Sequence, residues 1–182
     1  MSARHKPFIL GDTTYDLSHL DCFVFDCPTD FRDAPLTVGV RFSNHCYSCK
    51  CDDDAYAGED LLIDHNGNRR RFDLPRYDLT VHLGGLVRGL PQAKIYQTYE
   101  ERNYLHFSTQ LDVAEYRIFF HLRRASAGAD HDLTLFVESA YPLDGVDLVS
   151  RGRGRIRFPV LARKTYLGEA IRFDSGRNLR KR

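Results

Sequence analysis

One helical stripe followed by four strand-length runs constrains this chain more than any other sequence feature. The apolar residues of the stripe recur at helical spacing, at Leu79, Leu83, Leu86, Val87 and Leu90. Asp73 is suited to cap the start of this helix, with Pro75 in its first turn, and Pro91 is suited to end it. The pattern predicts one main helix near residues 74–90.

The four runs after the helix are separated by short links. They are Lys94 to Tyr99, Tyr104 to Ser108, Tyr116 to Arg123 and Leu133 to Tyr141. Successive strands with short connections usually pair with their sequence neighbours, in antiparallel fashion. We therefore expect the helix to be followed by a four-stranded antiparallel meander.

The region before the helix is also rich in strand signals. Apolar and polar residues alternate over residues 36–43, which is typical of a half-buried strand. Asn66-Gly67 lies between two further runs, 61–64 and 69–72, and this dipeptide strongly favours a hairpin. The predicted fold class is α+β, mostly antiparallel sheet, with an N-terminal β region and one main helix.

The chain is long enough for one well-buried core and short for two. We expect a single α+β domain over residues 1–150, followed at 151–182 by a basic C-terminal strand and tail. Residues 156–161 are the expected strand of that segment. No low-complexity linker divides the domain.

Positive charge is concentrated at the C-terminal end. The whole chain carries a net charge of +1, yet residues 151–182 hold eleven Lys or Arg against Glu169 and Asp174. Such an asymmetry predicts a polyanion partner, RNA first. The expected nucleic-acid-binding residues are Arg151, Arg153, Arg155, Arg157, Arg163 and Lys164. The alternative is a solvated basic face that pairs with the body's own carboxylates.

We expect a cytoplasmic protein that makes no membrane contact. No run approaches the roughly 18 apolar residues of a membrane span, and no secretory signal follows Met1. The five cysteines form an odd number, so we expect reduced thiols instead of a disulfide framework.

A cysteine-rich segment raises the alternative of a zinc site. Cys46, Cys49 and Cys51 follow His45, but the second Cys pair of a tetrahedral site is missing. Glycine-rich phosphate loops and the motifs of zinc proteases, α/β-hydrolases and dinucleotide enzymes are absent from the sequence as well. We therefore expect neither a metal nor a cofactor.

Alternation along the predicted meander sorts polar side chains onto shared faces. The residues concerned are Tyr104, His106 and Ser108 on one run and Arg117, His121 and Arg123 on the next. If both sets point to the same side, histidines, arginines and a tyrosine line one surface. The alternative is a polar sheet face that is simply exposed to water.

These residue types suit metal-free cleavage of RNA through its 2′-hydroxyl. The reaction needs a base, an acid and cations around the phosphorus. We expect His106 and His121 to be the acid and base, Arg117 and Arg123 to bind the phosphate, and Tyr104 to orient the substrate.

Several segments resemble an uncharacterised bacterial family whose members are sometimes labelled stationary-phase growth adaptation proteins. The segments are PFILGDTTYDLSHL (7–20), VRFSNHCYS (40–48), RRFDLPRYDLTVHL (70–83), ERNYLHF (101–107), YRIFFHL (116–122) and LFVESAY (135–141). This resemblance covers roughly residues 7–142 and implies no particular catalytic residues.

The order of a helix and a four-stranded meander is also similar to the RelE and barnase group of small ribonucleases. That likeness implies a metal-free site of His, Arg, Lys, Tyr or Glu on the sheet. The expected function is a metal-independent RNA-cleaving protein of bacterial toxin or defence type, which binds RNA or another polyanion and a cognate inhibitor protein. The alternative is a non-catalytic module that binds nucleic acid or protein.

Overall fold

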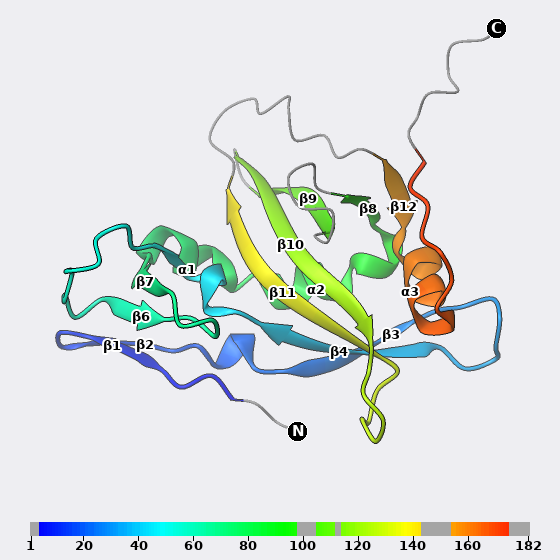
Figure 1. Ribbon diagram of the computed structural model, residues 1–182, viewed down its shortest axis with the longest axis horizontal. Coiled ribbons are helices and arrows are strands. Elements are labelled where there is room, and N and C mark those ends of the chain that lie inside the picture. The colour runs from blue at the N-terminus through cyan, green and yellow to red at the C-terminus, as the bar shows by residue number, and fades with distance from the viewer. Residues whose placement is uncertain (1–3, 98–104, 112–113, 143–153, 175–182) are drawn as a thin grey trace, which may run out of the picture.

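A seven-stranded sheet forms the centre of the protein in the computed structural model, which describes residues 4–97, 105–111, 114–142 and 154–174 (Figure 1). The order across the sheet is β12-β8-β9-β10-β11-β4-β3. The strands are β3 (Phe23–Cys27), β4 (Leu36–Phe42), β8 (Lys94–Gln97), β9 (Leu105–Leu111), β10 (Ala114–Arg124), β11 (Leu133–Pro142) and β12 (Arg155–Arg157).

The prediction of a mostly antiparallel α+β fold is confirmed in its general form, with one correction. Every neighbouring pair in this sheet is antiparallel except β11 and β4, which run parallel. Alternation over residues 36–43 predicted β4 as a strand, but alternation carries no information about strand direction or partner. The parallel pair joins the N-terminal β region to the strands that follow the helix.

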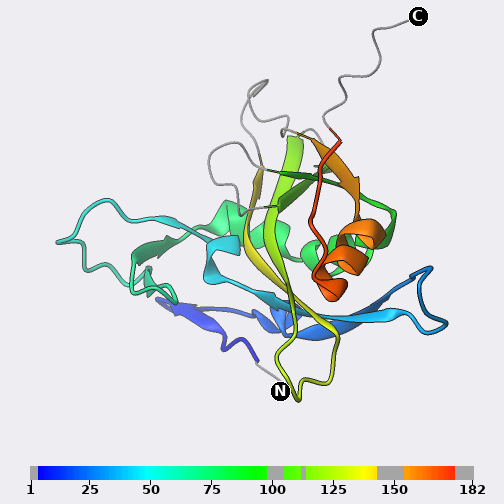
Figure 2. The same ribbon diagram turned by 45° about the vertical axis from the view of Figure 1, so that its right-hand side comes forward.

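Two smaller sheets lie at the opposite end of the molecule from α3 (Figures 1 and 2). One contains β5 (Ser48–Lys50), β7 (Arg69–Phe72) and β6 (Leu61–Ile63), in that order. The other is the hairpin of β1 (Phe8–Leu10) and β2 (Thr13–Tyr15). The hairpin predicted around Asn66-Gly67 is confirmed, because β6 and β7 pair antiparallel and Gly67 has a φ of 83°.

The predicted main helix consists of two short helices, α1 (Leu74–Thr80) and α2 (Leu83–Arg88), followed by the 3-10 helix η3 (Leu90–Gln92). The Asp73 cap is confirmed, since its side chain accepts a hydrogen bond from the Arg76 N–H. At the break, the Thr80 hydroxyl donates to the Tyr77 carbonyl, a back-bond that bends helices. No helix of the described residues is long and apolar enough to cross a membrane.

Residues 154–174 contain a helix that the sequence did not predict. The strand expected over residues 156–161 ends at Arg157, and α3 (Phe158–Leu167) begins where the strand was expected to continue. Pro159 explains the difference, because proline suits the first turn of a helix and cannot donate to a strand ladder. Helix α3 ends at Gly168, which has a φ of 70°.

The two faces of the main sheet differ in character. One face packs against α3 and forms the hydrophobic core, to which α2 also contributes, with fully buried residues that include Val38, Ile118, Phe120, Leu135 and Phe158. Along β11 the buried residues Leu133, Leu135 and Val137 alternate with half-buried ones. The second face therefore presents the intervening residues of β4, β10 and β11, and these are mainly polar.

Candidate functional site

The polar face of the sheet contains a hollow of about 310 Å³ where β10, β11 and β4 lie side by side. The sheet contributes Arg41, His121, Arg123, Thr134, Phe136 and Glu138 to its walls. The loop of the β6–β7 hairpin contributes His65 and Asn66. The hollow therefore lies between the rigid sheet and one hairpin loop.

Strand register brings these side chains together. Phe136 on β11 is the direct partner of both His121 on β10 and Arg41 on β4, so the three form a row across the sheet. Arg123 faces Thr134 in the next position on the same side. Sites built on neighbouring strands hold their side chains with little freedom, which favours a defined ligand geometry.

Glu138 lies on the same side of β11 as Thr134 and Phe136, at a β-bulge. Phe119 pairs with Ser139 whereas Phe120 pairs with Val137, so Glu138 is the extra residue of β11. Bulges re-aim side chains and are common beside active sites. Glu138 is half-buried at the wall of the hollow.

His45 connects Glu138 to the hairpin loop. Its Nδ1 lies 3.3 Å from Glu138 Oε1 and its Nε2 lies 2.9 Å from Asp64 Oδ2. Asp64 begins the loop, and its carboxylate also accepts hydrogen bonds from the Asn66 N–H, the Asn68 N–H and the Asn68 amide. The loop that carries His65 and Asn66 is thus joined to the sheet through one imidazole.

The Asp64 carboxylate is stabilised strongly in its charged form. Its side chain is 1% exposed, and this burial by itself would raise its pKa. Hydrogen bonds from Asn68, His45 and Asn66 outweigh that effect and hold the pKa of Asp64 well below its usual range. The negative charge that caps the loop therefore persists at any pH near neutrality.

The hollow suits an anionic ligand with a planar ring. Arg41 and Arg123 are exposed guanidinium groups, which bind phosphate through two donors at once. Phe136 lies on the floor, and His65 contacts its ring edge-on with centroids 5.5 Å apart. Imidazole and carboxylate groups of His121 and Glu138 border the same space.

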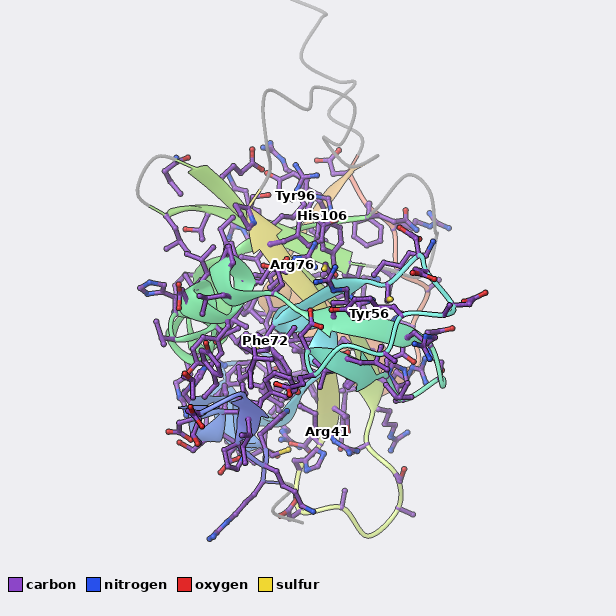
Figure 3. The ribbon with its side chains drawn as sticks, turned by 90° about the vertical axis from the view of Figure 1, so that its left-hand side faces the viewer. Arg41, Tyr56, Phe72, Arg76, Tyr96 and His106 are labelled. Carbon is purple, nitrogen blue, oxygen red and sulfur yellow. The ribbon has the colours of Figure 1, made fainter. Side chains whose placement is uncertain are left out.

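Two of the predicted catalytic residues line this hollow, and two lie elsewhere on the sheet, Arg117 on β10 and His106 on β9. His121 and Arg123 are at the hollow, together with Arg41. His106 and Arg117 are 4% and 5% exposed, and neither contributes to its walls. Figure 3 shows Tyr96 and His106 together toward one end of the molecule and Arg41 toward the other.

His106 lies among aromatic rings. It stacks on Tyr96 with centroids 5.5 Å apart and contacts Phe119 at 5.7 Å. Burial, and secondarily the charge of Arg117, lower the pKa of His106 to about 4. With this pKa the imidazole is neutral at pH 7, which disfavours His106 as the acid expected from the sequence.

Arg117 is engaged with its neighbours. Its Nε donates to Ser108 Oγ at 3.4 Å, and one terminal nitrogen lies 3.2 Å from Glu115 Oε1. This contact puts Ser108 and Arg117 on the same side of the sheet. Tyr104, the predicted orienting residue, lies outside the described residues.

The basic C-terminal residues lie apart from the hollow, because β8 and β9 separate β12 from β10. Arg155 and Arg157 are exposed on β12. Arg163 and Lys164 form ion pairs with Glu169 at 3.0 and 3.5 Å. The predicted nucleic-acid residues Arg151 and Arg153 lie outside the described residues.

The cysteines do not assemble into a metal site. All five are free thiols, and no group of three or more His, Cys, Asp or Glu with metal-ligand geometry occurs within residues 4–97, 105–111, 114–142 and 154–174. Cys46 lies in the core, where burial raises its pKa far above the usual value. Burial also raises the pKa of Cys27 to about 11.

Several residues of the hollow were not singled out from the sequence. Arg41 had a usable signal, because it occupies a polar position in the alternating run of β4. His65 and Asn66 lie in the predicted hairpin turn, but a turn sequence does not reveal what the turn covers. Glu138 also had a usable signal, because it is in phase with Thr134 and Phe136 in the alternation of β11.

Comparison with known proteins places the chain in a family. The model of the YjaZ family matches residues 7–166. The chain belongs to the YjaZ family. Every residue that lines the hollow lies within the match, so the hollow is part of the domain by which YjaZ-family membership is recognised. No curated protein and no solved structure matches the chain.

Proposed function

We propose that this YjaZ-family protein cleaves RNA without a metal ion and that the hollow is its active centre. The observation that carries the proposal is the meeting of Arg41 and Arg123 with His121 and Glu138 on one rigid sheet face. These groups supply positive charge, an acid and a base within one concave site. That combination is sufficient for attack of a ribose hydroxyl on its own phosphodiester.

Substrate binding relies on the two arginines and the phenyl ring. Arg41 and Arg123 bind the scissile phosphate, and their charge stabilises the additional negative charge of the pentacoordinate transition state. Phe136 provides a face on which a base stacks, which is a common way for proteins to hold single-stranded RNA. Unpaired RNA is therefore the expected substrate.

The proton transfers use groups from two strands. Glu138 takes the proton of the 2′-hydroxyl as its oxygen bonds to phosphorus, and His121 donates a proton to the 5′-oxygen as its bond to phosphorus breaks. The products are a 2′,3′-cyclic phosphate and a free 5′-hydroxyl. His45 keeps Glu138 in position through its 3.3 Å contact.

His106 takes no part in this scheme. Its low pKa and its place between Tyr96 and Phe119 suit packing and not proton donation at neutral pH. Exposed Arg155 and Arg157 add attraction for the RNA backbone without sequence preference. Binding is therefore expected to weaken as salt rises.

The test is cleavage of total RNA in EDTA by the parent protein and by matched variants. Arg123→Gln and His121→Ala are expected to lower the rate by at least about 100-fold, the usual loss when a charge-stabilising or proton-transferring group is removed. Arg124→Gln is the control, because Arg124 is the next residue on β10 and instead contacts the Tyr166 ring.

The proposal fails if the parent leaves RNA intact, or if the Arg123→Gln and His121→Ala proteins cleave as fast as the parent. Salt-sensitive binding of RNA without cleavage would instead favour the non-catalytic interaction module.

A further inference from the structure

A second set of polar groups reaches the hollow through Thr134. His131 Nε2 lies 3.0 Å from Thr134 Oγ1, and His131 Nδ1 lies 2.8 Å from Asp130 Oδ1. A carboxylate, an imidazole and a hydroxyl in this order make up the triad of nucleophilic hydrolases, which is recognised by geometry and not by sequence order. We propose that Thr134 is the nucleophile of an ester-hydrolysing activity, with His131 as its base and Asp130 as the residue that orients the base.

The position of His131 depends on Gly39. A Cβ added at Gly39 would lie 2.7 Å from the Cδ2 and Nε2 atoms of His131, so the ring occupies the space that any other residue would fill. Gly39 is the strand partner of Thr134 across β4 and β11. The missing side chain at Gly39 therefore lets the imidazole lie on the sheet directly beside the hydroxyl.

The two contacts of His131 suit the protonation pattern that a base needs. If Nδ1 carries the proton and donates it to Asp130, Nε2 is left to accept from the Thr134 hydroxyl. The hydrogen bond from His131 also lowers the pKa of Asp130. Because the Asp130 side chain is 72% exposed, its role is to orient the ring, and water screens its charge.

The surroundings of Thr134 indicate the substrate class. Arg123 is its strand partner on β10, and Arg41 lines the same hollow. Two guanidinium groups favour a carboxylic ester that also carries a negatively charged group. This inference shares the arginines of the proposed function but does not depend on RNA cleavage. RNA brings its own nucleophile, whereas an ester without a neighbouring hydroxyl requires one from the protein.

The reaction proceeds in two balanced halves. The Thr134 oxygen bonds to the acyl carbon while its proton moves to His131 Nε2, and the alcohol leaves with that proton as the ester bond breaks. Water then gives a proton to His131 as its oxygen bonds to the acyl carbon, and the bond between Thr134 Oγ1 and the acyl carbon breaks as Thr134 regains a proton from His131. One ester and one water yield one acid and one alcohol.

The experiment compares two p-nitrophenyl esters on the purified protein, the anionic hemiglutarate and the neutral butyrate. We expect faster turnover of the hemiglutarate and, after an acid quench, a glutaryl group on the peptide that contains Thr134. Thr134→Val is expected to lose turnover and the covalent adduct, while Thr134→Ser keeps both. His131→Gln is expected to lose at least about 100-fold in rate, the usual contribution of a general base.

Ser126→Ala is the control, because Ser126 is an exposed hydroxyl in the same β10–β11 loop. Circular dichroism of each variant distinguishes the loss of a catalytic group from unfolding of the protein. The inference is overturned if the parent hydrolyses neither ester, if Thr134→Val hydrolyses at the parent rate, or if the acyl group is found elsewhere. RNA cleavage is measured on the same preparations. RNA cleavage without ester hydrolysis refutes only this inference. Ester hydrolysis without RNA cleavage refutes only the proposed function.

Discussion

Acid is expected to destabilise the fold through His106. The imidazole has a pKa of about 4 in the folded protein, against 6.5 for an exposed histidine, chiefly because it is buried. The unfolded chain therefore binds one more proton than the folded chain between these two pH values, so stability falls as the pH falls through this range. The contribution of the neutral His106 imidazole to the unfolding free energy is fully present above pH 6.5 and is lost near pH 4. The two pKa values correspond to roughly 3 kcal/mol of unfolding free energy.

The measurement is urea unfolding of the parent and of His106→Phe at pH 7 and pH 4. Phenylalanine keeps a ring between Tyr96 and Phe119 but takes up no proton. Subtracting the loss of unfolding free energy of the variant from that of the parent removes the contribution of the carboxylates, because these titrate in both proteins. The parent should lose about 3 kcal/mol more than the variant, a large share of the roughly 5–15 kcal/mol that holds a domain together. Equal losses would refute the assignment of His106 as a buried neutral residue.

Two further predictions concern the supports of the site. Asp64→Asn is expected to destabilise the protein by about 3 kcal/mol at pH 7, because it removes a buried carboxylate that pairs with His45 and accepts hydrogen bonds from Asn66 and Asn68. The difference in unfolding free energy between variant and parent should shrink as the pH falls below 4. The Asp64 carboxylate stabilises the folded protein only where it is charged. Faster amide hydrogen exchange over residues 61–72 in Asp64→Asn than in the parent would confirm this destabilisation. Leu161→Ala in α3 should cost about 2–5 kcal/mol in urea unfolding, whereas Leu167→Ala, 45% exposed, should cost little.

Local signals in the sequence were sufficient for the elements that depend on local chemistry. Asp73 caps α1 because its side chain reaches the N–H three residues ahead. The turn at Gly67 needs a positive φ, which the Asn-Gly pair supplies. Alternation over residues 36–43 was sufficient to place β4. Each of these features is decided within a few residues of chain.

Tertiary contacts decided what the sequence left open. Residues 156–161 form a short apolar run, which suits either a strand or a helix; Pro159 favours the helical outcome, and Phe158 packs in the core there. Likewise, His106 and His121 have equivalent places in the alternation. The rings of Tyr96 and Phe119 pack against His106, whereas His121 lines the hollow.

The most direct test of the RNA-cleavage proposal is a DNA oligonucleotide with a single internal ribonucleotide, incubated in EDTA with the parent and with His121→Ala. The mechanism predicts one cut by the parent alone, 3′ to the ribonucleotide, with a 2′,3′-cyclic phosphate on the upstream product. Cleavage at deoxyribonucleotides, or equal cleavage by His121→Ala, would contradict attack by the 2′-hydroxyl at this hollow.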